Sequence, residues 1–168
     1  AGGGAVGDGG NIVIRDPLVL GTSSTLLNTG TGTTAGDITV SSTINGAQIL
    51  TLTYGSGTLS LGGAVGGGTP LTGLTINGNA IPLSVDITTN NGDVEINGPV
   101  TLGANITITT NNGDIDFSST IDGGQALILA SGSGAVAVQG AIGGNTGLSA
   151  LTVNSAGAGT VEIANIGG

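Results

Sequence analysis

The sequence predicts an all-β protein whose short strands stack as a β-solenoid with coils of about 21 residues, two of them enlarged by loops. Three observations lead to this fold class. Glycine, threonine, asparagine and serine make up 87 of the 168 residues, which disfavours helix at nearly every turn. Apolar and polar residues alternate in short runs, and these runs recur at fixed spacings. We expect a single solenoid domain over residues 1–168.

The expected strands are runs in which apolar residues, many of them β-branched, alternate with polar ones. Such period-two patterning is typical of half-buried strands. Each run is bounded by Asn-Gly, Gly-Gly or Ser-Gly, which favour turns. In chain order the expected strands are residues 38–41, 50–53, 59–61, 74–77, 94–97, 106–109, 115–118, 136–139, 151–154 and 161–163.

Internal repetition favours a solenoid over other arrangements of short strands. Residues 34–77 align without a gap with residues 111–154, at an offset of 77, and residues 87–93 recur as 108–114, at an offset of 21. The glycines that open successive strands are 21, 35, 21, 21 and 25 residues apart. The two long intervals indicate inserted loops or, for the interval of 35, an additional short coil. These glycines are Gly36, Gly57, Gly92, Gly113, Gly134 and Gly159.

Successive coils of a solenoid lie about 4.8 Å apart, so equivalent residues stack in columns. We expect the first strand of every coil to lie in one such column. An immunoglobulin-like sandwich, the structural alternative, needs hairpins and gives no reason for a 21-residue register. The residues expected to point inward are Ile38, Val40, Leu59, Leu61, Val94, Ile96, Ile115, Phe117, Val136, Val138, Val161 and Ile163. Those expected to face outward are Thr39, Ser60, Glu95, Asp116, Ala137 and Glu162.

Composition excludes several functional classes. One cation, Arg15, stands against ten acids, so the net charge of −9 argues against binding to nucleic acid or anionic membranes. Histidine, cysteine and lysine are absent, which removes the Ser-His-Asp triad and the usual zinc ligands. Two aromatic residues, Tyr54 and Phe117, are too few for a sugar-binding cleft. We therefore expect no enzyme, no catalytic residue, no cofactor and no membrane insertion.

Three segments resemble the repeats of large bacterial exoproteins, the filamentous-haemagglutinin-like and autotransporter-passenger proteins. They are residues 62–75, 99–107 and 113–117, and the resemblance extends over nearly the whole chain from about Gly36. The resemblance implies a right-handed parallel β-helix, secretion, and a role at the cell surface or in the matrix, in adhesion or fibre formation. It leaves the export route and the parent protein open.

Stacked acids are the first candidate site. Asp93 and Asp114 follow the same Asn-Asn-Gly sequence, Asp37 is expected to share their column, and Glu95 and Asp116 form a second pair. Stacked carboxylates repel one another unless a donor or cation compensates, and calcium prefers such oxygen ligands. The alternative is that each aspartate caps its own turn. We favour the turn, and assign no residue as a metal ligand.

Other polar patterns have structural interpretations. Asn90 and Asn91 are expected to lie beneath Asn111 and Asn112 as an asparagine ladder. The outward column is too irregular for an ice-binding threonine face. Asn105 begins an N-glycosylation pattern that chance alone produces in a chain of this composition.

The chain ends complete the prediction of function. Residues 160–168 read as the opening of another coil, and residues 3–7 as mid-coil, so the chain is expected to be a segment of a longer solenoid or a fibre subunit. Uncapped strand edges pair readily with another chain. We expect an extracellular structural protein, a scaffold, filament or adhesin segment, that stacks head to tail with itself and contacts surface glycans. A glycan- or calcium-binding surface module is the alternative.

Overall fold

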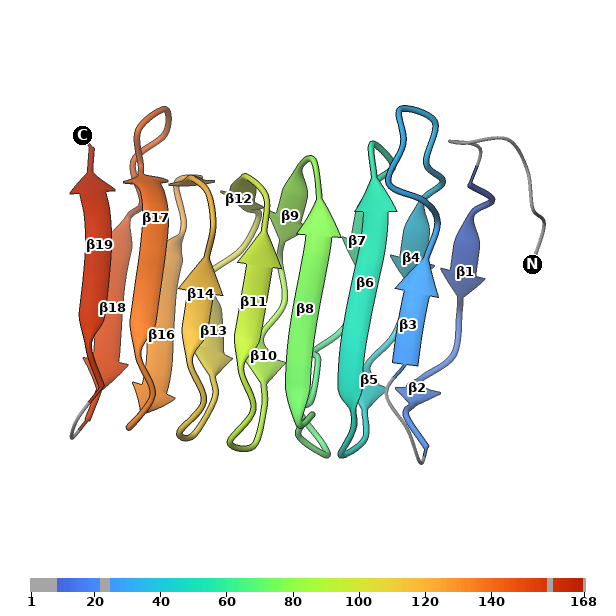
Figure 1. Cartoon of the computed structure of the whole chain (residues 1–168), viewed down its shortest axis with the longest axis horizontal. Helices are drawn as coiled ribbons and strands as arrows, with labels where there is room; N and C mark the ends of the chain where they lie inside the picture. Colours follow the sequence, from blue (N-terminus) through green and yellow to red (C-terminus); the bar gives the residue numbers. More distant parts are fainter. Residues whose placement is uncertain (1–8, 22–24, 157–158, 168) are drawn as a thin grey trace.

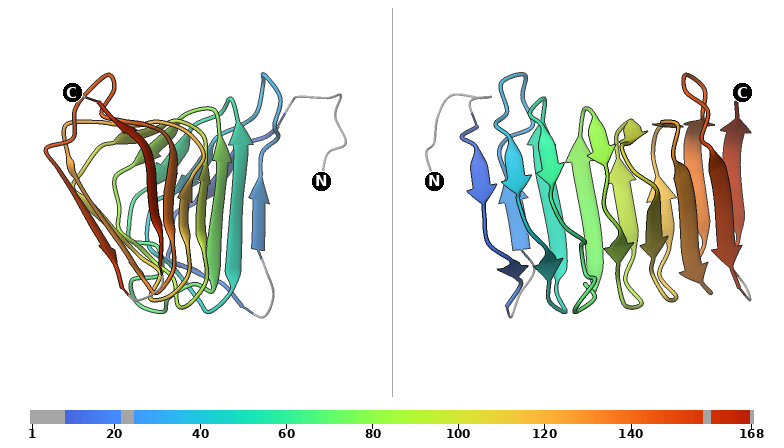
Figure 2. Two further views of the ribbon diagram at one scale, coloured as in Figure 1. Left: turned by 60° about the vertical axis from the view of Figure 1, so that its left-hand side comes forward. Right: turned by 180° about the vertical axis from the view of Figure 1, so that it is seen from behind.

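The computed structural model describes residues 9–21, 25–156 and 159–167. Within them the chain is all-β, with parallel strands stacked as a β-solenoid of about 7 turns. The coils follow one another along a single axis from the N-terminal to the C-terminal side (Figures 1 and 2). In Figure 1 the front strands run upward, the strands behind run downward, and the chain advances from right to left, so the coil is right-handed. The predicted fold class is confirmed.

The chain visits three faces in each coil, in the order B, C, A, and most coils place a strand on each face. At Val65, face C has an isolated bridge in place of a strand. Face A contains β3 (Thr25–Asn28), β6 (Ile49–Gly55), β8 (Gly73–Gly78), β11 (Val94–Asn97) and β14 (Ile115–Phe117). Face B contains β1 (Ile12–Ile14), β4 (Ile38–Val40), β7 (Leu59–Leu61), β9 (Ile81–Leu83), β12 (Val100–Leu102) and β15 (Ile121–Asp122). Face C contains β2 (Leu18–Val19), β5 (Ile44–Asn45), β10 (Ile87–Thr88), β13 (Ile106–Thr109), β16 (Ala126–Gly132) and β18 (Ala150–Ser155). β17 (Val136–Ile142) and β19 (Val161–Ile166) start on face A and end on face B.

The core is a set of apolar columns that run along the solenoid axis. Inward Ile, Leu and Val side chains of neighbouring coils stack on one another, and both aromatic rings, Tyr54 and Phe117, are buried among them. The predicted alternation is confirmed through the body of the stack. It weakens in the last described coil, where Val161 is 47% exposed because no further described coil covers it.

The prediction that all first strands share one column is wrong. Ile38 pairs with Leu59 on face B, whereas Val94 pairs with Ile115 on face A. The 35-residue interval is therefore one coil plus two further faces rather than an inserted loop. Every face has a strand that begins two residues after a glycine, as β4, β11 and β16 do on faces B, A and C. The local sequence therefore does not distinguish one face from another.

Coil length also varies more than the sequence indicated. Residues 21 apart pair in the middle of the stack, as Val94 does with Ile115. Towards both ends the paired residues are up to 26 apart, as for Ile12 with Ile38. The mean spacing is about 23 residues.

The 77-residue repeat maps one face onto another. β4, β5 and β6 correspond to β14, β15 and β16, which lie on faces A, B and C in place of B, C and A. The two copies of the repeat also share strand lengths, since β6 and β16 each have seven residues. Their registers shift at Thr53/Gly55 and at Ala130/Gly132, which are also 77 residues apart. An offset of 77 thus corresponds to three coils and two thirds of a fourth.

Candidate functional site

The predicted column of aspartates connects neighbouring coils. Asp93 Oδ1 accepts a hydrogen bond from the backbone N–H of Asp114 at 2.9 Å, and Asp114 Oδ1 accepts one from the N–H of Ala135 at 2.7 Å. Asp37 makes the same bond to the N–H of Thr58 at 2.8 Å, but it lies on face B and does not share the column. Each carboxylate therefore holds the next coil rather than capping its own turn.

Glu95 and Asp116 do lie in register, side by side on the outer surface of face A. Partial burial raises the pKa of Asp116, and the charges of Asp114, Asp93 and Glu95 raise it further. Glu95 Oε2 accepts a hydrogen bond from the Thr75 hydroxyl at 3.4 Å. Across the described ranges, no three acidic side chains are placed to hold a metal ion together. The carboxylates of Glu95 and Asp116 thus repel each other as expected of stacked acids, and they are not arranged to bind a metal ion together with a third acid.

A second type of acidic corner was not predicted. Asp122 Oδ1 accepts the backbone N–H groups of Asn145 at 2.8 Å and Thr146 at 3.1 Å. These bonds, that of Asn145 first, lower the pKa of Asp122. Asn45 stands 77 residues earlier and accepts the corresponding pair of N–H groups at 2.7 and 3.0 Å. The 77-residue repeat was the signal that could have identified this corner.

The asparagine ladder is confirmed, with one row of three side chains. Asn112 Nδ2 donates to Asn91 Oδ1 at 2.8 Å, and Asn112 Oδ1 accepts from the backbone N–H and hydroxyl of Ser133. The other asparagine of the upper pair, Asn111, donates instead to the backbone carbonyl of Thr89. This ladder places polar contacts at 21-residue intervals along one corner.

A second polar ladder crosses the outer surface of face A. Asn77 Nδ2 donates to the Thr53 hydroxyl at 3.2 Å, and Asn97 Nδ2 donates to Asn77 Oδ1 at 3.1 Å. The sequence analysis missed this ladder because it placed residues 38–41 and 59–61 in the column of residues 94–97. The strands that actually share this face with β11 are β6 and β8. Its residues are all neutral. They bond to one another and line a shallow hollow of about 200 Å³ whose other lining residues are also uncharged.

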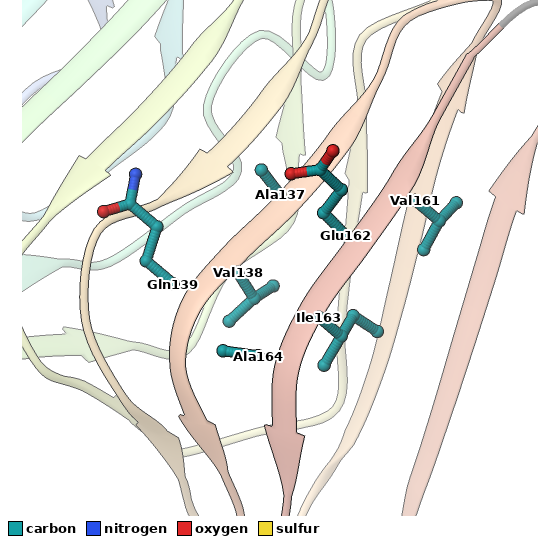
Figure 3. Close-up of a pocket in the computed structure, with 7 residues that line it drawn as sticks. All are labelled: Ala137, Val138, Gln139, Val161, Glu162, Ile163 and Ala164. Atoms are coloured by element: carbon teal, nitrogen blue, oxygen red, sulfur yellow. The ribbon is translucent and has the colours of Figure 1, made fainter.

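The hollow in Figure 3 lies where two residues of β17, Gln139 and Gly140, oppose one residue of β19, Ala164. Of the seven side chains drawn, Gln139 and Glu162 are the polar ones, and they project from different strands. The remaining lining is apolar. One carboxylate and one amide do not form a pair of acids for glycoside hydrolysis.

The open ends of the stack are its most unusual surface. Within the described residues, the outer edges of β18 and β19 pair with no further strand. Ile166 there is 65% exposed. In the first described coil Val13, Val19 and Leu26 are 51%, 71% and 59% exposed, at positions where the next coil has threonine or asparagine.

Comparison of the chain with protein-family models, curated proteins and solved structures returned no match. The resemblance to exoprotein repeats therefore stays a prediction. None of the described residues forms a helix long and apolar enough to cross a membrane. The fold and the geometry of the side chains carry the functional argument.

Proposed function

We propose that this β-solenoid is an extracellular structural element, a scaffold or filament segment whose copies stack end to end. The observation that carries the proposal is the pair of open ends. Within the described residues, the outer strand edges of the first and last coils pair with no further strand. In the last coil Val161 is 47% exposed, whereas Val136, its partner in the preceding coil, is fully buried.

The geometry of the two ends is complementary. A second copy placed beyond β19 would set its β1 over the face B end of β19, its β2 over β18, and its β3 over the face A start of β19. All three faces would continue as parallel sheet with the normal spacing of about 4.8 Å. Such a head-to-tail contact does not close on itself, so repeated addition gives a filament.

The composition supports a durable material. A chain with one cation offers trypsin a single cleavage point, and it lacks the cysteine and methionine that oxidise most easily. The polar side chains at the corners bond to neighbouring coils, which favours a structural use of these groups over a binding one. We do not propose calcium binding, because no three acidic side chains of the described residues are placed to hold a metal ion together. Contact with surface glycans stays a prediction.

Sedimentation velocity over a range of concentrations, with electron microscopy of the same samples, tests the proposal. We expect the chain to form filaments one solenoid wide. The variants V161K and I166K place charges on the open apolar end and are expected to leave folded monomers, as checked by circular dichroism. E162Q changes an outward residue of the same strand and is the matched control that still assembles. A wild-type chain that stays monomeric at the highest concentration contradicts the proposal.

A further inference from the structure

Five asparagines of the chain precede glycine, the sequence most prone to spontaneous loss of the side-chain amide. In this reaction the backbone nitrogen of the glycine attacks the asparagine Cγ, so the glycine N–H has to be free and the local backbone has to rotate. Folded structure slows the reaction wherever it restrains either one. The five are Asn45, Asn77, Asn91, Asn97 and Asn112.

Four of these sites are restrained. After Asn45 the glycine N–H donates to the carbonyl of Thr69 at 3.1 Å, and after Asn112 it donates to the carbonyl of Thr110 at 3.3 Å. The side chain of Asn112 is also held by contacts on both sides in the ladder. Asn77 and the glycine after it both lie within strand β8. Asn97 is the last residue of β11, and the N–H of Gly98 beyond the strand makes none of the hydrogen bonds of the described residues. Asn97 is restrained instead by its place in β11 and by its side-chain amide, which donates to Asn77 Oδ1 at 3.1 Å.

Asn91 is different. It is exposed and lies outside any strand, in the corner between β10 and β11. Among the hydrogen bonds of the described residues, none uses the N–H of Gly92. The Asn91 side-chain amide has only a long contact of 3.4 Å, to Asn90, and its oxygen accepts from Asn112.

We propose that Asn91 is the preferred site of spontaneous deamidation in the folded protein, with water as co-reactant. The Gly92 nitrogen gives its proton to solvent hydroxide and forms a bond to Cγ of Asn91. The Cγ–Nδ2 bond then breaks, and ammonia leaves with a proton from water. Water opens the resulting five-membered imide at either carbonyl, giving aspartate or isoaspartate at position 91.

The aspartate product is compatible with the ladder. A carboxylate oxygen at position 91 still accepts from Asn112 Nδ2, and charge strengthens that hydrogen bond. The isoaspartate product adds a methylene to the backbone at a residue whose φ is +60°, and so disturbs the corner. The site lies in the middle of the stack, away from both ends, so the inference does not rest on the proposed function.

Ageing the folded chain in mildly alkaline buffer tests the inference. A protease that cleaves before aspartate releases residues 86–92 and 93–113 as separate peptides, so mass spectrometry reads Asn91 and Asn112 independently. We expect conversion at Asn91 to be at least about fivefold faster than at Asn112, the factor that one net hydrogen bond supplies. The urea-unfolded chain, in which all five sites are free, is expected to lose this preference.

The variant N91G keeps a residue suited to positive φ and removes the reactive amide. It is expected to lose the earliest acidic species seen on ion exchange. Equal rates at Asn91 and Asn112 in the folded chain, faster conversion at any other asparagine, or no conversion at Asn91 while the unfolded chain reacts, would each overturn the inference.

Discussion

Tyr54 and Gly78 give the sharpest test of how this core is packed. The Tyr54 side chain is buried, and its hydroxyl donates to the carbonyl of Ala80 at 3.0 Å. A Cβ built on Gly78 would lie 2.3 Å from Tyr54 Cζ and 2.5 Å from its hydroxyl oxygen. In the second copy of the 77-residue repeat these two positions are Ser131 and Ser155. The tyrosine and the glycine are thus expected to depend on each other.

The double-mutant cycle of Y54S and G78S measures that dependence. Y54S empties the site of a buried ring and is expected to cost about 3–5 kcal/mol. G78S alone forces the ring to move and is expected to cost at least about 2 kcal/mol. With Y54S already present, the serine at position 78 has room, and its added cost is expected to fall below about 1 kcal/mol.

Urea unfolding followed by far-ultraviolet circular dichroism gives the four stabilities, because Y54S removes the only tyrosine fluorophore. Y54F is the control for the hydroxyl and is expected to cost about 1–2 kcal/mol by leaving the Ala80 carbonyl without its donor. Additive effects of Y54S and G78S, within about 0.5 kcal/mol, would refute the reasoning.

The remaining predictions concern glycine and charge. G134A sets a Cβ 2.0 Å from a neighbouring carbonyl and should lower the melting temperature strongly, whereas G124A, with open space around it, should not. Because the pKa of Asp122 is lowered in the folded chain, its carboxylate stabilises the fold above the ordinary aspartate pKa, and this stabilisation is lost as pH falls below about 4. In urea titrations the stability of D122N should therefore fall less in acid than that of the wild type. The pKa of Asp116 is raised, so D116N should stabilise the fold at neutral pH but not in acid. The same acid loss of stability in D122N as in the wild type, or no gain in stability of D116N at neutral pH, would contradict these predictions.

The fold class could be predicted from the sequence because the period-two runs and the 21-residue repeat both follow from stacked coils. The assignment of strands to faces could not be predicted. Ile38 and Ile115 follow the same Gly-Asp sequence, yet they lie on faces B and A, since only the number of residues between them decides the face. Strands of two residues, such as β5 and β15, are too short to show a period and were also missed.

The surroundings of the stacked acids were also beyond the reach of the sequence. From sequence, Asp93 and Asp114 are two stacked acids, and whether a cation or a donor compensates their repulsion depends on where the backbone of the next coil lies. The structure places a backbone N–H within 2.9 Å of each carboxylate. That donor was invisible in the sequence because every residue except proline has one, and only the coil spacing brings it into reach.

A chain with one cation cannot use ion pairs to hold its coils in register. Hydrogen bonds from side chains at the polar corners to the backbone of the next coil fix the register instead. The bonds from Asp93 to Asp114, from Asp114 to Ala135 and from Asp86 to Thr107 each span 21 residues. Each is an acceptor side chain on one coil and a backbone donor on the next, so insertion of a single residue between them would break the bond and turn the following strand over. Coil length and corner chemistry therefore constrain each other in the body of the stack. Within the described residues, the first and last coils each lack a neighbouring coil on their outer side. The proposed stacking of copies would supply that neighbouring coil.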